Sequence, residues 1–559
     1  MKKYKILVVF ILFGLIQKNM AQTNHFESEA IFMHTNTSTF VTGENLLYKI
    51  YCLNANTLKL SEISKIAYVE IINEKGESLI RNKIALKNGV GTNEIFLNTT
   101  FNTGTYKLVA YTNWMLNNSK SKYFETYITI INPFTSNEIK PNNENLTANN
   151  SNETEIKENI DVALNPSKKS FTKRDKVVVN IDLKSDKFKN GNYSVSVRKT
   201  DNLTTNSTNS IYYFKENNTD KFVTSTTFLP ELRGELISGK IIANNDNKLV
   251  SGKDIALSFT GEPFDLKIVK TNENGGFYFN LNEDFRKSEA LIQILENNLN
   301  DYQIIFDQPI TFEKTNTPNL SFSSKSIKDI EDRLVASQIV NAYKTTDSTV
   351  EKNKNFIPFY YQYAKDYILD NYKRFPSFKE TIIEIIPELF FKQKDNTYTL
   401  HLRDYVTNGE SFGKPLVMVD GLLLQDVNEL FDYNTNNIYK ISTINKPYSY
   451  GSKIFSGVVS IITFNKEYES KSNKIKPITL ERCDAEKDFT SVIYEADNNY
   501  DRIPDYRYQI AWETNLSLKN NTNSIEFYTS DISGKFEIYL EGFSLNGEPL
   551  SIKKYFTVD

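Results

Sequence analysis

The segment that comes nearest to a catalytic motif is 409–413, Gly-Glu-Ser-Phe-Gly, which matches the G-x-S-x-G pattern of a nucleophile elbow. In that elbow the serine sits between a strand and a helix, and a histidine later in the chain acts as the base. Here strand-like patterns at 398–406 and 416–419 lie on both sides of Ser411, and no histidine follows it. We therefore keep a serine hydrolase using Ser411 only as the least favoured alternative.

Other reactive residues are few. The histidines are His25, His34 and His401. His401 and Asp404 precede Ser411 on one predicted strand, where side chains alternate between faces instead of converging. The chain has no phosphate-binding loop, no H-E-x-x-H pair and no complete calcium loop. We expect no catalytic residue, no cofactor-binding residue, no metal ligand and no cofactor, so the protein is not expected to be an enzyme.

The N-terminus is typical of a secretory signal. Lys2, Lys3 and Lys5 precede an apolar stretch at 6–16, and cleavage after Ala21 fits the pattern. That stretch is too short to span a bilayer, and no later segment reaches the length of a membrane helix, so no span is expected after cleavage. We predict Sec-dependent export. Periplasm, outer-membrane association and the cell surface all stay open.

The composition predicts a folded, β-rich protein. The 559 residues are 39% hydrophobic and 13% aromatic, with a net charge of -3, so nothing indicates a nucleic-acid partner. The aromatic surplus is compatible with a recognition surface, although strands also favour aromatic residues. The two cysteines, Cys52 and Cys483, are predicted to be separate buried thiols.

Secondary structure is predicted to be mostly strands with alternating patterns. They run from about 25 to 133 and resume at 177–183 and 193–197 after an Asn-rich linker. Helical spacing predicts a helix at 324–343 and a second helical stretch at roughly 361–386, which Pro387 ends.

One region resembles the plug domain of TonB-dependent outer-membrane receptors. The resemblance rests on 414–421, which ends in Asp-Gly, on 437–444, on the Tyr-Gly-Ser at 450–452, and on 456–463. In that family the plug sits inside a barrel of about 22 strands. Only 93 residues follow Lys466, so the resemblance implies the fold of the plug without a pore.

Two further regions resemble known modules. Residues 232–240 and 274–279 are similar to the carboxypeptidase regulatory-like sandwich, a non-catalytic module of envelope proteins of the Bacteroidetes type. Residues 104–115 are similar to macroglobulin domains of exported bacterial proteins. Neither Cys52 nor Cys483 lies in the Gly-Cys-Gly-Glu-Gln motif of a thioester, so covalent trapping is not implied.

The fold class that we predict is mainly β and multidomain, with macroglobulin or Ig-like sandwiches and a small α+β plug-like domain. The expected order is a signal peptide at 1–21, a macroglobulin-like sandwich at 22–133, a linker at 134–164, half of a macroglobulin-like sandwich at 165–227, a regulatory-like sandwich at 228–312, a helical connector at 313–360, a plug-like domain at 361–468 and a C-terminal β segment at 469–559. We hypothesise that 165–227 and 506–559 complete one sandwich.

These expectations favour a non-catalytic binding or scaffold protein of the cell envelope. An accessory subunit of an outer-membrane TonB-dependent transport or secretion complex stays open as the main alternative. The expected partners are proteins, among which a barrel complex of the outer membrane stays open.

Overall fold

The computed structural model describes residues 27–135, 161–203, 210–218, 222–223, 225–245, 248–282, 284–295, 301–315, 324–343, 356–404, 409–410, 413–485, 487, 489, 491–494 and 503–559. The predicted signal peptide, most of the linker and Ser411 lie outside these residues. The chain is mainly β and multidomain, which confirms the predicted fold class. Within the described ranges, none of the helices combines the length and the apolar character needed to cross a membrane.

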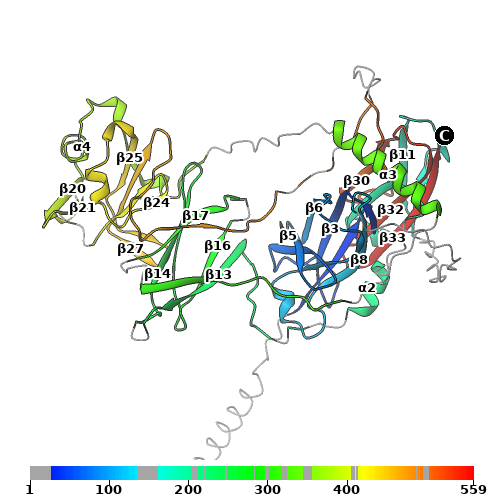
Figure 1. The fold of residues 1–559 in the computed structure, drawn as a ribbon, viewed down its shortest axis with the longest axis horizontal. Coiled ribbons are helices and arrows are strands. Elements are labelled where there is room, and N and C mark those ends of the chain that lie inside the picture. The colour runs from blue at the N-terminus through cyan, green and yellow to red at the C-terminus, as the bar shows by residue number, and fades with distance from the viewer. Residues whose placement is uncertain are drawn as a thin grey trace, which may run out of the picture. The chain divides into compact units, whose positions relative to one another are not determined.

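The chain forms two compact units, each built from separate pieces of sequence (Figure 1). Unit one comprises Met1–Leu232, Thr311–Thr345 and Asp484–Asp559, and unit two comprises Arg233–Ile310 and Thr346–Cys483.

Unit one begins with an N-terminal sandwich of two sheets, in the strand orders β1-β3-β6 and β2-β8-β7-β4-β5. The strands are β1 (Glu29–Thr35), β2 (Thr39–Val41), β3 (Asn45–Asn54), β4 (Ile66–Ile72), β5 (Ser78–Ala85), β6 (Val90–Phe96), β7 (Gly104–Tyr111) and β8 (Phe124–Ile131). Cys52 is buried in its core, and Cys483 is the second buried free thiol, as predicted.

The second sandwich of unit one joins distant parts of the sequence, and we call it the discontinuous sandwich. Its sheets have the orders β10-β33-β32-β12-β30 and β31-β11-β9. The strands are β9 (Val162–Pro166), β10 (Ser170–Phe171), β11 (Lys176–Leu183), β12 (Asn192–Lys199), β30 (Gln509–Leu516), β31 (Thr522–Tyr528), β32 (Gly534–Phe543) and β33 (Pro549–Val558).

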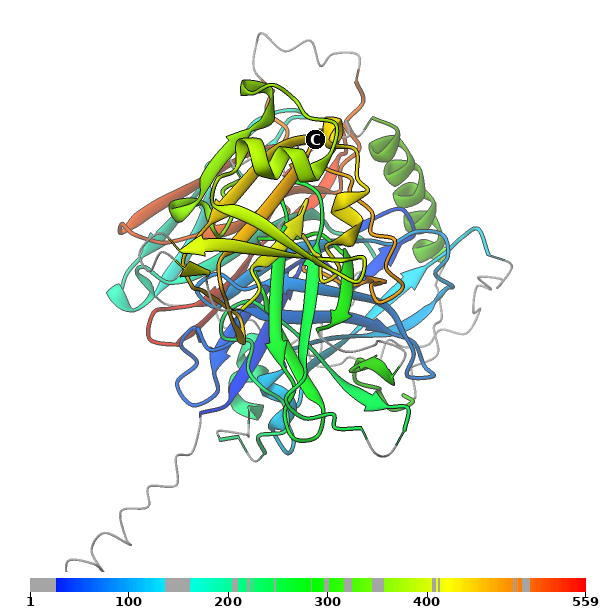
Figure 2. The same cartoon turned by 90° about the vertical axis from the view of Figure 1, so that its left-hand side faces the viewer.

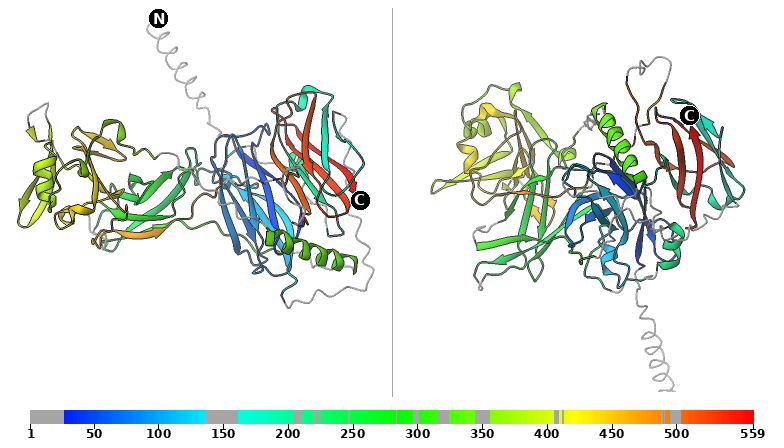
Figure 3. Two further views of the ribbon diagram at one scale, coloured as in Figure 1. Left: turned by 90° about the horizontal axis from the view of Figure 1, so that it is seen from above. Right: turned by 45° about the vertical axis from the view of Figure 1, so that its right-hand side comes forward.

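The pairings in this sandwich are those that the sequence hypothesis requires. β11 is antiparallel to β31, with Lys176 opposite Tyr528, and β12 lies between β30 and β32. In Figure 3 the red C-terminal strands accordingly lie beside the teal strands of β9–β12. Segments more than 300 residues apart therefore share one core, in which Val177, Val179 and Phe536 are fully buried.

Both faces of the sheet β1-β3-β6 are covered. One face packs in the N-terminal sandwich and the other packs on β12 and β32, where the Tyr51 hydroxyl donates to the Glu541 carbonyl at 3.2 Å. For this reason β1 and β3 are buried almost without alternation, and Ser194 of β12 is buried although the sequence pattern places it on the polar face of its strand.

The helical segments of unit one are η1 (Trp114–Asn117), η2 (Asp186–Phe188), α2 (Ile211–Asn217) and α3 (Ser324–Tyr343). The bounds of α3 coincide with the predicted helix. Its buried face centres on Ile330 and Arg333. The Arg333 guanidinium donates to Oε1 of Glu44 at 3.0 Å and to the carbonyl of Thr39 at 2.7 Å, and it lies 3.4 Å from Asp201.

Unit two contains a sandwich and a small α+β module. The sandwich has sheets of order β16-β13-β18 and β15-β14-β17-β29. Its strands are β13 (Glu235–Ala243), β14 (Asp254–Phe259), β15 (Asp265–Lys270), β16 (Gly276–Leu281), β17 (Glu289–Ile294), β18 (Tyr302–Phe306) and β29 (Lys476–Thr479). β29 falls in the expected C-terminal β segment, yet it pairs with β17.

The α+β module is built on a sheet of order β19-β25-β28-β23-β24 (Figure 2). Its elements are η4 (Tyr361–Tyr363), β19 (Lys365–Ile368), η5 (Leu369–Asn371), α4 (Phe378–Ile385), β20 (Leu389–Lys394), β21 (Thr397–Asp404), β22 (Gly409–Glu410), β23 (Leu416–Val419), β24 (Leu422–Leu423), α5 (Asn428–Phe431), η6 (Thr435–Asn437), β25 (Ile438–Ile444), β26 (Tyr448–Tyr450), β27 (Lys453–Phe455) and β28 (Val458–Thr463).

The Asp-Gly pair noted in the sequence makes the tight turn between β23 and β24. Asp420 and Gly421 have φ values of 50° and 87°, the positive values that a two-residue hairpin turn requires. The buried Asp420 carboxylate accepts hydrogen bonds from the main chain of Thr463 at 2.8 Å and of Tyr468 at 3.1 Å. This aspartate therefore fastens the turn to the end of β28.

The predicted helical stretch at 361–386 is largely wrong. That interval holds η4, the strand β19 and η5, and only 378–385 forms an α-helix. Pro376 explains the late start, because proline disfavours helix in the residue before it, and Ser377 caps α4 by accepting from the Glu380 N–H at 3.2 Å. Pairing of β19 with β25 overrides the helical spacing upstream.

Candidate functional site

The residues considered for hydrolase chemistry are not assembled into a site among the described residues. His401 lies half-exposed on β21, with its ring stacked on Phe390 at 5.3 Å and its Nε2 2.8 Å from the Thr399 hydroxyl. Asp404 ends the same strand, and Ser411 lies outside the described residues. No group of three or more His, Cys, Asp or Glu side chains that could hold a metal occurs in the described part of the chain.

A different set of residues forms a buried polar cluster in unit one. The His34 Nδ1 lies 2.6 Å from the Ser194 hydroxyl, and its Nε2 lies 4.0 Å from a carboxylate oxygen of Glu541. The Tyr51 hydroxyl lies 2.9 Å from the same serine. These side chains come from β1, β12, β32 and β3, so the cluster joins the two sandwiches of unit one.

The cluster resembles a Ser-His-Glu arrangement, but its electrostatics and burial fit a structural role. Burial, with the nearby charges of Lys49 and Lys553, lowers the pKa of His34 to about 3. Burial raises the pKa of Glu541 to about 7. A nucleophile must be reached by its substrate, whereas Ser194 is 0% exposed and Glu541 is 3% exposed. We assign the cluster to the packing of the sandwiches.

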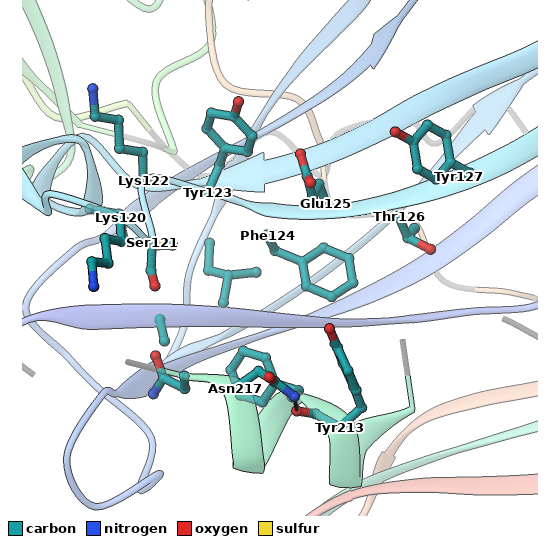
Figure 4. Close-up of a pocket in the computed structure, with 15 residues that line it drawn as sticks. Lys120, Ser121, Lys122, Tyr123, Phe124, Glu125, Thr126, Tyr127, Tyr213 and Asn217 are labelled. Carbon is teal, nitrogen blue, oxygen red and sulfur yellow. Dashed lines mark hydrogen bonds between the residues drawn. The ribbon is translucent and has the colours of Figure 1, made fainter. Parts of the chain in front are cut away.

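An accessible hollow of about 490 Å³ lies on the N-terminal sandwich of unit one. It lies among β1, the start of β8 and α2 (Figure 4). We call it the edge groove. Its lining consists of Ala30, Ile31, Met115, residues 120–127, Tyr213, Phe214, Asn217 and Asn218.

The strand β8 presents two kinds of side chain at the groove. Glu125 and Tyr127 project from one side of it, as does Tyr123 just before the strand, and Phe124 and Thr126 project from the other side (Figure 4). This is the alternation of a strand with one buried face. The buried Phe124 ring lines the groove and packs edge-on against Phe32 at 6.0 Å.

The helix α2 is held beside the groove by its own caps and by one aromatic anchor. The Ser210 hydroxyl accepts from the Tyr213 N–H at 3.2 Å, and the Phe214 ring packs on Phe32 at 5.5 Å. These contacts leave Tyr213 51% exposed. The Asn217 amide donates to the carbonyl of Tyr213 at 2.9 Å, so the polar side of the helix is ordered.

The charge of the groove is positive at one end. Lys120 and Lys122 are exposed where the chain enters β8. Glu125 is matched by Lys107 of β7, whose Nζ lies 2.9 Å from its carboxylate. Burial acts to lower the pKa of Lys107, but the hydrogen bond and charge of Glu125 outweigh burial and raise it.

Sequence reasoning identified no residue of this groove as a site. One weak signal was present: the run Lys-Ser-Lys-Tyr at 120–123 stands before an alternating strand that carries exposed tyrosines. The contribution of α2 had no signal at all, because 211–217 is far from β8 in the chain and meets it only in the fold.

Comparisons of the sequence find no protein family whose model matches this chain, and no curated protein matches it.

Solved structures that match include bacterial alpha-2-macroglobulins. The Escherichia coli protein activated by porcine elastase is 10% identical, with 95% of this chain and 44% of that chain covered and a TM-score of 0.24. The Salmonella protein reacted with methylamine is 8% identical, with 96% and 40% covered and a TM-score of 0.23. The trypsin-activated Escherichia coli protein is 10% identical, with 95% and 41% covered and a TM-score of 0.24. The chain spans less than half the length of these structures, and the fold described above rests on the strand pairings of the chain itself.

Proposed function

We propose that this chain is an exported, non-catalytic binding or scaffold protein of the cell envelope, and that its N-terminal sandwich holds a protein partner in the edge groove. The observation that carries the proposal is the contrast within unit one. Ser194, His34 and Glu541 are sealed in a core, whereas the edge groove is open and is lined in part by tyrosines and lysines. Tyrosine and other aromatic residues are enriched where proteins recognise one another.

The finer parts of the proposal come from the sequence. Residues 1–21 direct export, after which the chain works in the periplasm, at the outer membrane or on the cell surface. Residues 22–133 form a macroglobulin-like module, 228–312 a regulatory-like module and 361–468 a plug-like module without a barrel. Fractionation of cells that produce the protein, combined with N-terminal sequencing, tests this. An uncleaved chain recovered from the cytosol would overturn export.

A second candidate function has its own support in unit two. The ring of Phe359 stacks on Tyr450 of the β26–β27 hairpin at 4.2 Å. Nearby Tyr363 and Ile454 are 74% and 78% exposed, which is unusual for large apolar side chains. This surface would let the plug-like module dock on an outer-membrane barrel, as expected of an accessory subunit of a TonB-dependent complex.

Site-specific crosslinking in intact cells separates these functions. A photoreactive residue is placed at Tyr127 or Tyr213 in the groove, at Tyr363 or Ile454 in unit two, and at exposed Leu79 of β5 as a control. The proposal expects a defined protein adduct from the groove positions and none from Leu79. Adducts to a barrel protein from unit two alone would favour the accessory subunit. No adduct at any position above the Leu79 background would refute both.

The proposal that the protein is not an enzyme is tested separately. A panel of ester, peptide and glycoside substrates is incubated with the full chain and with the Ser411→Ala variant. Equal, background rates are expected for both proteins. Turnover that disappears in the variant would overturn the proposal in favour of a serine hydrolase.

A further inference from the structure

The main chain of β8 offers a strand edge along the groove. The Thr129 N–H donates to the Ser38 carbonyl at 2.9 Å, and the Ile131 carbonyl accepts from the Thr42 N–H at 2.9 Å. Odd-numbered residues of β8 therefore direct their N–H and C=O groups away from β7. Because successive residues of a strand alternate, Glu125 and Tyr127 direct theirs to the same edge.

Among the described strands, this edge is covered only in part. β2 pairs with Thr129, Ile130 and Ile131, whereas 124–128 pairs with β7 on the opposite side and with no strand on this one. The short length of β2 thus leaves the first half of β8 as a template for another strand.

The opposite wall of the groove is also a strand edge. The Ser28 carbonyl accepts from Ala55 next to β3, and the Asn36 N–H donates to Leu47 of β3, so even-numbered residues of β1 face β3. Ile31 therefore directs its N–H and C=O groups away from β3, on the side of the sheet where the groove lies. A hollow with a strand edge on two sides fits an extended chain in shape, and its edges offer the N–H and C=O groups with which such a chain would form hydrogen bonds.

We propose that the edge groove takes an extended peptide segment of a protein partner, which adds as a strand to the open edge of β8 and places an acidic side chain against Lys120 and Lys122. The sign of the charge follows from the lining, which carries two lysines, Lys120 and Lys122, against one carboxylate, Glu125. This inference deepens the proposed function and rests on it. Main-chain hydrogen bonds would give affinity, and the lysines would set the direction of the bound peptide and its preference for acidic residues.

The test uses the full chain and a pool of random dodecapeptides. Selection is expected to enrich peptides with acidic residues at one end and alternating apolar positions. Methylation of every second peptide nitrogen should abolish binding, because it removes the donors of a strand. On the protein side, the amide of Tyr127 should exchange more slowly with solvent when a selected peptide is bound.

Two variants with matched controls locate the site. Tyr127→Pro removes an N–H that faces the open edge and takes no part in the pairing with β7, a position where strands tolerate proline. We expect roughly tenfold weaker binding, the effect of losing one hydrogen bond and the strand geometry. Tyr127→Val also loses the ring but keeps the N–H, so it is expected to bind clearly more tightly than Tyr127→Pro, and the difference between the two variants reports the main-chain donor. Circular dichroism checks that both variants are folded.

A double variant, Lys120→Glu with Lys122→Glu, tests whether the two lysines attract acidic peptides. Binding of acidic peptides should fall by roughly tenfold or more and lose its dependence on salt. The control variant reverses the charge of the exposed Lys59 and Lys75 of the same sandwich, and its peptide binding should change little.

The outcomes separate this inference from the proposed function. Failure to enrich peptides, or binding that is indifferent to nitrogen methylation and to Tyr127→Pro, would overturn strand addition. Dimers that form through the groove would also overturn it, since the occupant would then be a second copy. If groove crosslinks in cells persist after such a result, partner binding stands and only the strand mechanism fails.

Discussion

Glu541 shows how a single buried titratable group makes the stability of unit one depend on pH. Its folded pKa is about 7 against an ordinary value of 4.5, and burial is the main cause. As pH rises from 4.5 to 7, the unfolded glutamate releases its proton while the folded one retains it. The wild type therefore loses stability across this window, by about 3 kcal/mol, and the loss is complete above pH 7.

Glu541→Gln removes this dependence, so its stability relative to the wild type should rise by that amount between pH 4.5 and 7. His34 titrates in both proteins, so its effect largely cancels in the comparison. Both tryptophans of the chain, Trp114 and Trp512, belong to unit one, so urea unfolding followed by their fluorescence reports this unit. The exposed Glu526→Gln is the control. Parallel pH profiles for wild type and Glu541→Gln would contradict the prediction.

The same residues mark a limit of sequence reasoning. His34, Ser194 and Glu541 are separated by 160 and 347 positions, and nothing in the spacing of a single chain indicates that they meet. The reverse holds for Asp420 and Gly421, whose turn is local. Positive φ values are common for Asp-Gly pairs, and the Asp-Gly pair noted in the sequence is the turn of this hairpin.

At the scale of elements, α3 is fixed to unit one by a buried charge cluster. Arg333 contacts Glu44 and Asp201, and Arg198 lies 3.0 Å from Glu44. Burial acts to raise the pKa of Glu44, but the charges of Arg333 and Arg198 outweigh burial and lower it. The Glu44 carboxylate is therefore ionised and depends on its cationic partners.

Arg333→Leu should release α3. Removing one member of a buried ion pair leaves uncompensated charge and costs about 4 kcal/mol. We expect the α3 amides to exchange freely in hydrogen-exchange measurements, while the exposed Glu331→Ala on the same helix leaves them protected. Adding Glu44→Gln to Arg333→Leu should restore part of the stability. Unchanged protection of α3 in Arg333→Leu would show that apolar packing alone holds it.

Helices and strands were predictable where the spacing of apolar residues was regular over a long stretch. The periodicity of 324–343 gave α3, and the alternation of Val177, Val179 and Ile181 gave β11. The helical spacing at 361–386 misled because β19 gains more from pairing with β25 than from a local helix. The edge of β8 was not predictable, because an open edge depends on where β2 stops.

At the scale of the molecule, the discontinuous sandwich makes the C-terminus essential to strands near residue 180. Deleting 506–559 removes β30, β31, β32 and β33, the partners of β11 and β12. The amides of β9, β11 and β12 should then exchange at the rate of an unfolded chain. Those of β13 and β14 in unit two should keep their protection, because their sheets use other partners.

The full chain and a deletion ending at residue 505 are compared by hydrogen exchange with mass spectrometry. Native protection of β11 in the truncated chain would contradict the shared core. Loss of protection in β14 as well would show that unit two depends on the C-terminal strands, against the modular arrangement.

The sequence by itself determined the mainly β, multidomain fold class, the position of α3 and the local turns, because these depend on composition and on neighbours along the chain. Tertiary structure alone decided the order and register of the strands in each sheet, which serine and histidine are sealed away, and where a strand edge stays open. Those features depend on segments hundreds of residues apart packing together, and burial and pairing are properties of the assembled sheets.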